Sequence, residues 1–299
     1  MPIYPITFCI DESKIITEIP IKTKLISSII PNNTFSYSYN TEESYYNEYK
    51  SSLFAITIKK AGWDCMRHYE IIANGCIPYF ADIEKCPPNT LKFFPKDLII
   101  KGNNLYEKHK NKDINDLTIV EYNDCLDLIN KLLEYLKNNL TTTKMANYIM
   151  QKSNITPEKK ILFISGKKES DYLRDNILIG FKKIFGINCH DYPLLPYIYK
   201  NGSMTKNRLH GKGFSYCNIL DLNLRNNNLD NNILNDINNK KYDLIIVGNF
   251  HGDIPPYISE ITNKYESKKI IFLCGEDIHD CSSNLQYSEF GYTVYMREM

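Results

Sequence analysis

The second half of the chain alternates short apolar runs with amphipathic segments, and this alternation constrains the fold more than any other feature. Apolar runs at 161–166, 242–248 and 269–275 each end in glycine, and a fourth run follows at 291–297. Between the first two runs, segment 172–185 places its apolar residues at helical spacing. Continuous apolar strands separated by helices are typical of a parallel sheet that is covered on both faces. We therefore predict an α/β fold with a doubly wound sheet.

The first half also mixes strands and helices, and a polar segment separates it from the second half. Residues 151–158 are polar and contain Pro157, and a new strand begins directly after them. The chain of 299 residues is long enough for two domains. We predict a domain at 1–150 and another at 158–299, both Rossmann-like. The expected strands and helices of the first half are 3–10, 54–58, 67–74, 76–80, 126–138 and a helix capped by Thr141 or Thr142.

Composition excludes several classes of function. The 36 basic and 35 acidic residues give a net charge of +1, so no overall positive field attracts nucleic acid. No apolar stretch is long enough for a transmembrane helix, and the N-terminus lacks the pattern of a secretory signal. The nine cysteines are irregularly spaced, without a C-x-x-C pair, and we expect reduced thiols in a cytoplasmic protein.

Residues 59–82 carry the side chains that predict chemistry. A helix that opens near Asp64 offers free backbone N–H groups and the positive end of its dipole, which suit a diphosphate. Arg67 and Glu70 are three residues apart and share one face of this helix. Arg67 has the geometry to bind phosphate oxygens, and Glu70 can accept hydrogen bonds from ribose hydroxyls.

Each of these residues also has a simpler explanation. Arg67 and Glu70 fit an ordinary ion pair on a helix surface. Asp64 and His68 fit a catalytic pair, but a helix cap and a stacking ring explain them equally well.

The pattern G-W-D-C-x-R-H-Y-E-I-x-A-x-G-C-I-P-Y-F at 62–80 resembles the donor-binding motif of GT-B glycosyltransferases. It is most similar to the exostosin-type branch and to a set of viral and bacterial glycosyltransferase-like proteins. The resemblance implies a nucleotide-sugar donor in a cleft between two Rossmann-like halves. It further implies that Glu70 contacts the ribose. We expect no metal or other cofactor, because basic groups and helix N-termini can carry the charge of the diphosphate. The residues implied in donor binding are Lys59, Lys60, Asp64, Arg67, His68, Glu70, Gly75 and Pro78, of which Gly75 and Pro78 also fit a purely architectural role.

The chain departs from this family in two respects. Gly62 stands where many retaining enzymes carry a second glutamate. The donor-like motif also comes first, whereas GT-B enzymes place the acceptor half first. This order predicts either a circularly permuted fold or a chain that is a piece of a longer tandem protein. A permuted fold would bring the two termini together and would place Glu70 and the loop 276–279 on one cleft.

The second half has to supply a general base if the chain is an enzyme. His251, Asp277 and His279 are the candidates. Glu276, Asp277, His279 and Cys281 could also form a metal site, but no spacing supplies further ligands, and we favour a role in lining the cleft. Segment 209–213 also resembles a piece of the same set of proteins, and it otherwise predicts a loop.

The sequence thus predicts a glycosyltransferase that uses a nucleotide sugar and an acceptor of unknown kind. The alternative is a non-catalytic module that binds a nucleotide or carbohydrate, which the glycine at position 62 and the order of the halves favour. A transferase of another Rossmann type, such as one using S-adenosylmethionine, is less well supported because no glycine-rich loop with a following acidic residue is present.

Overall fold

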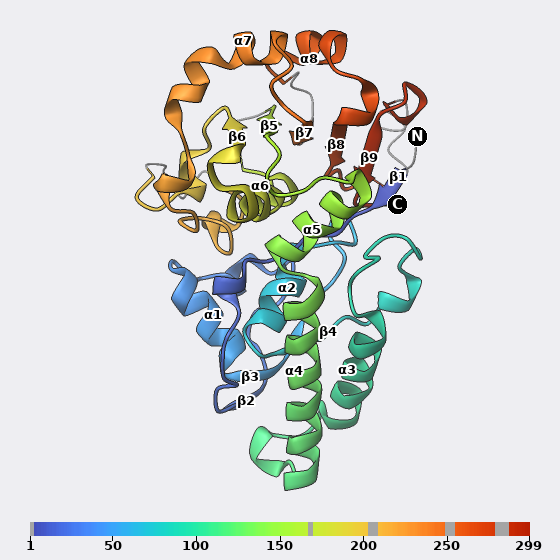
Figure 1. The fold of residues 1–299 in the computed structure, drawn as a ribbon. Coiled ribbons are helices and arrows are strands. Elements are labelled where there is room, and N and C mark those ends of the chain that lie inside the picture. The colour runs from blue at the N-terminus through green and yellow to red at the C-terminus, as the bar shows by residue number, and fades with distance from the viewer. Residues whose placement is uncertain (1–2, 167–169, 203–208, 249–254, 279–286) are drawn as a thin grey trace.

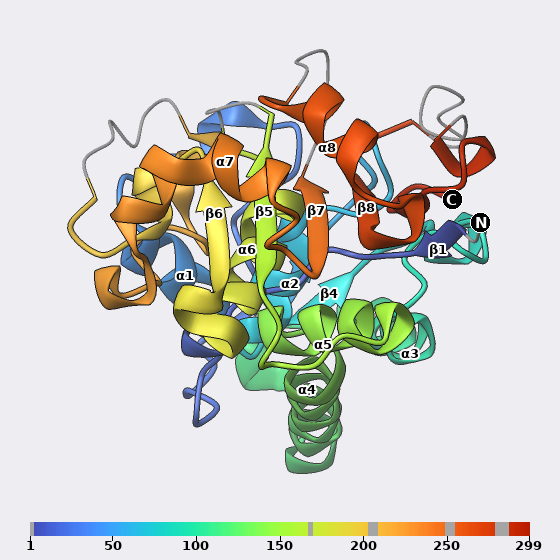
Figure 2. The ribbon, with the colours of Figure 1, turned by 45° about the horizontal axis from the view of Figure 1, so that its top comes forward.

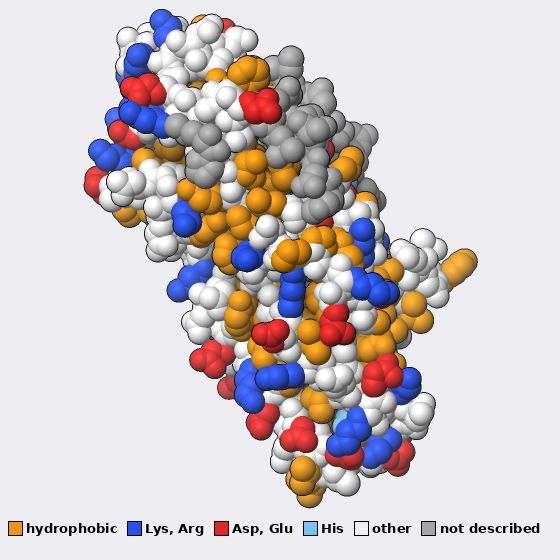
Figure 3. All heavy atoms as spheres, turned by 90° about the vertical axis from the view of Figure 1, so that its right-hand side faces the viewer, with side chains coloured by type: hydrophobic (Ala, Val, Ile, Leu, Met, Phe, Trp, Pro, Cys, Tyr) orange, Lys and Arg blue, Asp and Glu red, His pale blue; other side chains and the backbone are white. Residues whose placement is uncertain are grey.

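The computed structural model describes residues 3–166, 170–202, 209–248, 255–278 and 287–299. It contains two parallel sheets with helices packed around them, which confirms the predicted α/β class. The larger sheet has six strands and the smaller has three. In keeping with the net charge of +1, basic and acidic side chains are interspersed on the face shown in Figure 3. None of the helices in these ranges is long and apolar enough to cross a membrane.

The six-stranded sheet takes five strands from the second half of the chain. They are β5 (Ile161–Ser165), β6 (Cys189–Tyr192), β7 (Leu244–Gly248), β8 (Ile270–Cys274) and β9 (Thr293–Met296). All are parallel, and β5 lies between β6 and β7. If these five strands are numbered 1 to 5 in chain order, they lie side by side in the order 2-1-3-4-5, which is typical of a doubly wound sheet.

The two faces of this sheet explain its continuous apolar runs. Successive side chains of a strand point to opposite faces. In β5, Ile161 and Phe163 join the core on the side of α6, whereas Leu162 and Ile164 join the core on the side of α7 and α8. Both faces of the sheet are therefore buried against apolar side chains. A strand that alternated apolar and polar residues would leave one face polar.

Helices cover both faces of the six-stranded sheet. On one side α6 (Tyr172–Phe185) packs on β5 and β6, and α5 (Thr142–Ser153) packs on α6. On the other side lie α7 (Ile233–Asn238) and α8 (Ile258–Lys264), as Figure 2 shows. Gly180 allows the close approach of α5 to α6, because a Cβ there would lie 2.1 Å from the Thr142 carbonyl oxygen.

The smaller sheet belongs to the first half. Its strands are β2 (Lys24–Ile26), β3 (Ser52–Ile56) and β4 (Ile77–Tyr79), all parallel, with β3 in the centre. The helices of this half are α1 (Glu42–Lys50), α2 (Met66–Ala73), α3 (Lys96–His109) and α4 (Ile119–Asn139). The helix α2 begins after the loop that follows β3 and leads into β4, as the sequence predicts.

The N-terminal strand β1 (Ile3–Pro5) pairs with the last strand, β9, rather than with the sheet of its own half. The expected strand at 3–10 is thus shorter, and its remainder is a buried connection toward the first half. The pairing brings the terminal strands side by side, as a permuted fold requires (Figure 1). The division of the chain at 150 to 158 stays a prediction, because β1 and α5 both pack on the second half.

Candidate functional site

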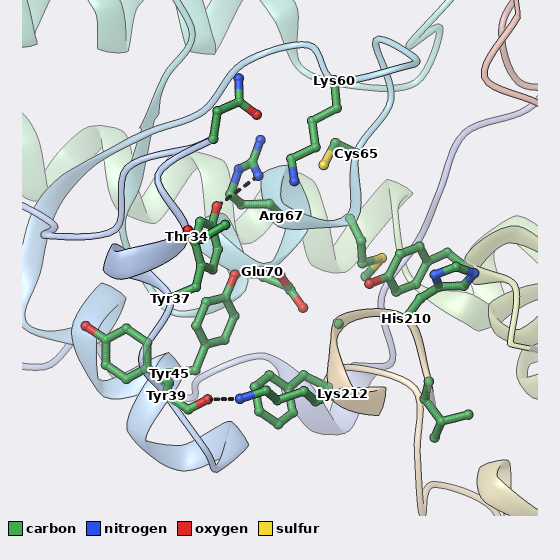
Figure 4. A pocket seen from close by; sticks show the side chains of 16 residues that line it. Thr34, Tyr37, Tyr39, Tyr45, Lys60, Cys65, Arg67, Glu70, His210 and Lys212 are labelled. Carbon is green, nitrogen blue, oxygen red and sulfur yellow. Dashed lines mark hydrogen bonds between the residues drawn. The ribbon is translucent and has the colours of Figure 1, made fainter. Parts of the chain in front are cut away.

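A cavity of about 620 Å³ lies between the two halves of the chain at the N-terminal end of α2. Its volume falls within the usual range for small-molecule sites. Figure 4 shows Lys60 and Arg67 on one side of it and His210 and Lys212 on the other. The first half contributes Asn32, Thr34, Tyr37, Tyr39, Tyr45, Lys60, Cys65, Met66, Arg67 and Glu70, and the second half contributes Tyr172 and 209–214 except Gly213.

Arg67 is a buried cation that faces this cavity. Its side chain is 5% exposed. Nε donates to Thr57 Oγ1 (3.1 Å), Nη1 to the Tyr37 hydroxyl (3.1 Å) and Nη2 to the Ile58 carbonyl oxygen (3.2 Å). All three acceptors are neutral, and no carboxylate in the described ranges forms an ion pair with Arg67. A buried charge is costly without a counter-charge, so this geometry favours an anion in the cavity.

Glu70 lies one helical turn further along α2 and also lines the cavity. It is 6% exposed, and the Tyr45 hydroxyl donates to Oε2 at 3.1 Å. Burial raises the pKa of Glu70 to about 7, although hydrogen bonds from Tyr45 and Ser215 oppose this shift. The carboxyl group therefore changes charge near neutral pH and has acceptor capacity left for hydroxyl groups of a ligand.

The two lysines of the motif lie in different surroundings. Lys60 lines the cavity, and in the described part of the chain its ammonium has no hydrogen bond or ion-pair partner. Lys59 does not line the cavity, and its Nζ lies over the ring of Trp63 at 5.1 Å. The structure thus distinguishes a lysine that can meet a ligand from one that covers the tryptophan.

The second half closes the cavity with the loop 209–214. Lys212 Nζ donates to the Tyr39 carbonyl oxygen (2.6 Å), which ties the loop to the first half. Phe214 packs on Tyr45 with ring centroids 5.6 Å apart. His210 lines the cavity beside Tyr172, with ring centroids 6.1 Å apart, and its ring is exposed.

Asp64 and His68 face away from the cavity. Asp64 is buried and accepts hydrogen bonds from the Phe8 N–H (2.7 Å) and the Tyr69 hydroxyl (2.9 Å). It does not cap α2, whose N-cap is Cys65. The His68 ring is completely buried and packs on Phe80. Both residues therefore stabilise the motif through buried contacts and do not face a ligand in the cavity.

Gly75 and Pro78 also lie away from the cavity. Gly75 follows the C-terminal end of α2 with φ +66°, and a Cβ there would lie 2.5 Å from Ile16 Cδ1. Pro78 is buried within β4 opposite Ala55. The structure shows an architectural setting for both.

A buried charge cluster holds the start of the motif against the second half. Arg297, at the end of β9, donates from Nη1 to the Asp64 carbonyl oxygen (2.6 Å) and to Glu298 Oε1 (2.8 Å). The Asp64 N–H donates to the same Glu298 oxygen (2.9 Å). A Cβ at Gly62 would lie 2.5 Å from this oxygen. A side chain at position 62 would therefore force this cluster to shift, and the packing disfavours a second glutamate there.

Asp277 belongs to this cluster, because it forms an ion pair with Arg297. It is not among the side chains that line the cavity, so the expectation that Glu70 shares a cleft with the loop 276–279 fails for residues 276–278. The loop 209–214 occupies that place instead. His251 and His279 lie outside the described residues. Within the described ranges no group of three or more His, Cys, Asp or Glu is placed to hold a metal ion.

Several lining residues had no signal in the sequence. Tyr37, Tyr39 and Tyr45 come from an irregular segment and from α1 in a chain with 23 tyrosines. His210 and Lys212 stand in segment 209–213, to which the resemblance assigns no site residue and whose glycines otherwise predict a loop. Comparisons of the chain with protein-family models, curated proteins and solved structures gave no match.

Proposed function

We propose that this chain binds a nucleoside diphosphate sugar in the cavity and acts as a glycosyltransferase. The observation that carries the proposal is the Arg67 guanidinium, which is buried, faces the cavity and has only neutral partners in the described structure. Lys60 adds a second positive charge on the same side. A diphosphate supplies the negative charge that these two side chains lack, and arginine binds phosphate oxygens in a bidentate manner.

The remaining lining residues suit the other parts of such a donor. Glu70 lies one helical turn from Arg67, so its carboxylate can accept hydrogen bonds from ribose hydroxyls while Arg67 holds the diphosphate. The rings of Tyr39, Tyr45 and Phe214 form an aromatic wall. Flat aromatic surfaces of this kind suit the stacking of a nucleobase.

In the transfer, an acceptor hydroxyl oxygen forms a bond with the anomeric carbon while the bond from that carbon to the diphosphate oxygen breaks. The diphosphate leaves with the bonding electrons, and Arg67 and Lys60 stabilise its charge. The hydroxyl proton needs a base. His210 is our candidate, because its exposed ring lines the cavity from the second half.

We further propose a GT-B-like arrangement in which the two sheets belong to the two substrate-binding halves. The motif loop that follows β3 contacts Arg297, which itself follows β9 and donates to the Gly275 carbonyl oxygen after β8. The loops after the carboxyl ends of strands from both sheets therefore meet, and Lys60 of the same motif loop lines the cavity. Ligands of open parallel sheets usually lie at such strand ends.

Ligand binding and turnover test this function separately. Thermal shift and calorimetry with UDP, GDP, ADP and CDP, and with their glucose conjugates, should show stabilisation by at least one of them. Donor hydrolysis is then followed by chromatography, and H210A should lower the rate while leaving donor affinity unchanged. If none of these compounds binds, the proposal is overturned.

Binding without turnover would support the second candidate, a non-catalytic nucleotide- or carbohydrate-binding module. One observation favours this candidate. Gly62 stands at the position of the second glutamate of many retaining enzymes, and a side chain there would force the carboxylates of Asp277 and Glu298 to shift.

A further inference from the structure

Arg67 begins a chain of three hydrogen bonds behind the cavity, the first two of which are buried. Its Nε–H donates to Thr57 Oγ1 (3.1 Å), Thr57 Oγ1 lies 2.8 Å from His68 Nδ1, and His68 Nε2 lies 2.9 Å from the Trp63 carbonyl oxygen. Thr57 and His68 are both completely buried. Neither side chain lines the cavity, so neither can touch a ligand there.

The chemistry of the groups fixes the direction of two bonds in this chain, and a neutral His68 ring fixes the third. The Trp63 carbonyl oxygen can only accept, so His68 carries a proton on Nε2. The guanidinium can only donate, so the Thr57 oxygen accepts from Arg67. The Thr57 hydroxyl then has its own hydrogen to give, and Nδ1 of a neutral imidazole is the acceptor that it meets.

Burial of the His68 ring is in agreement with this assignment. Burial and the neighbouring positive charge of Arg67 together lower the pKa of His68 to about 3. The ring therefore stays neutral across the physiological range, with one nitrogen as donor and the other as acceptor.

We propose that Thr57 and His68 are positioning residues that hold the Arg67 guanidinium in the orientation needed to bind the diphosphate. This inference rests on the proposed function of the cavity. Arginine has five N–H donors, and three of them are used by Thr57, Tyr37 and Ile58. One N–H on each terminal nitrogen is left for a ligand. The chain of hydrogen bonds through Thr57 and His68, which we call the relay, fixes the plane of these two N–H groups.

The neutral imidazole is essential to the relay. A protonated His68 would present an N–H at Nδ1 and would force the Thr57 hydroxyl to accept from it as well as from Arg67. A residue that merely fills space at position 68 would keep the packing on Phe80 but would leave the hydroxyl hydrogen of Thr57 without an acceptor. The order of donors therefore explains why a histidine, a threonine and an arginine occur together here.

The test compares T57V, which loses the hydroxyl at nearly constant shape, with T57S, which keeps it. The probe is whichever of UDP, GDP, ADP or CDP binds the wild-type protein, together with its nucleoside. We expect T57V to bind the diphosphate roughly tenfold more weakly. Its affinity for the nucleoside should be unchanged, and T57S should restore diphosphate binding.

A matched control is T142V. Thr142 is also completely buried, its hydroxyl donates to Asp11 Oδ2 (3.2 Å), and neither residue lines the cavity. This variant should lose stability but keep the affinity for both ligands. An equal loss of affinity for diphosphate and nucleoside in T57V would overturn the positioning role, whereas failure of the wild-type protein to bind any diphosphate would overturn the proposed function instead.

A second measurement is independent of both ligand binding and the folding of T57V. Nitrogen-15 NMR of the histidine rings in the wild-type protein should show His68 as the neutral tautomer with its proton on Nε2 at pH 7. A proton on Nδ1, or a charged ring at this pH, contradicts the direction of the relay.

Discussion

Arg67 and Glu70 lie three residues apart on α2, and both line the cavity. Both lie in the described part of the chain, and their side chains form no ion pair with each other. Opposite charges at this spacing usually pair on a helix surface. Here Arg67 is held by Thr57, Tyr37 and Ile58, and Glu70 is held by Tyr45. Each side chain is thus left to meet a different part of a ligand, and the interpretation of the two as a simple ion pair is wrong.

The separate role of Arg67 predicts a selective effect of R67K. Lysine keeps the positive charge but cannot reproduce the planar set of donors, and a hydrogen bond to a charged group contributes about 1.5–3 kcal/mol. Calorimetry should show roughly a tenfold or larger loss of affinity for the nucleoside diphosphate. The nucleoside serves as the control ligand, and an equal loss for both ligands would rule out the phosphate role.

The two lysines of the motif provide a matched pair of variants. K60A removes a positive charge from the cavity wall and should weaken diphosphate binding by about 1 kcal/mol in low salt. The effect should shrink as ionic strength rises, because Lys60 is exposed. K59A should leave binding unchanged and cost at most about 0.5–1 kcal/mol of stability, since Lys59 only covers Trp63. A larger effect of K59A than of K60A on affinity would reverse the assignment.

The sequence predicted the parts of the site that depend on local pattern. The helical spacing of Arg67 and Glu70 and the position of α2 before β4 follow from neighbouring residues, and the structure confirms both. The choice between Lys59 and Lys60 could not be predicted, because adjacent residues in a loop point in directions that only the packing of Trp63 decides.

Long-range packing accounts for the rest. His210 reaches the cavity because the loop 209–214 is bonded to Tyr39 and packed on Tyr45, and no periodic pattern records such contacts. The pairing of β1 with β9 joins the two ends of the chain, and a local pattern can identify both strands but not that they pair with each other.

The helix α3 was not predicted for a local reason, because its sequence contains Gly102 and two asparagines, which are poor helix formers.

Glu70 predicts a dependence of stability on pH. Burial raises its pKa from 4.5 in the unfolded chain to about 7 in the folded protein. The folded state therefore binds more protons between these two values, and its stability should fall as pH rises from about 5 to about 7. Asp64 shifts in the same direction, so the difference between the wild-type protein and E70Q isolates Glu70.

Urea unfolding at several pH values measures this difference. The free energy of unfolding of E70Q, relative to that of the wild-type protein, should rise by about 1–3 kcal/mol between pH 5 and pH 8. A difference that does not vary with pH would show that Glu70 does not titrate in this range.

Glu70 also predicts a dependence of ligand binding on pH. The ionised carboxylate is the better acceptor for ribose hydroxyls, so nucleoside affinity should rise as pH increases through about 7. The nucleoside is the suitable probe because it carries no phosphate that titrates in this range. E70Q should bind more weakly at pH 8 by roughly tenfold and should show a flat profile. The same rising profile in E70Q would assign the titration to another group.

The last prediction concerns the packing of the motif loop against the second half. A Cβ at Gly62 would lie 2.5 Å from Glu298 Oε1 and 3.0 Å from Arg297 Nη1, and both of these side chains are buried. Because neither can move into solvent, G62A should destabilise the protein by about 1–3 kcal/mol in urea unfolding. The control is G275A, where the nearest atom would be at 3.4 Å, an ordinary contact, and the loss of stability should be smaller. Equal stability of G62A and the wild-type protein would show that the contact between this loop and the end of β9 is looser than the structure indicates.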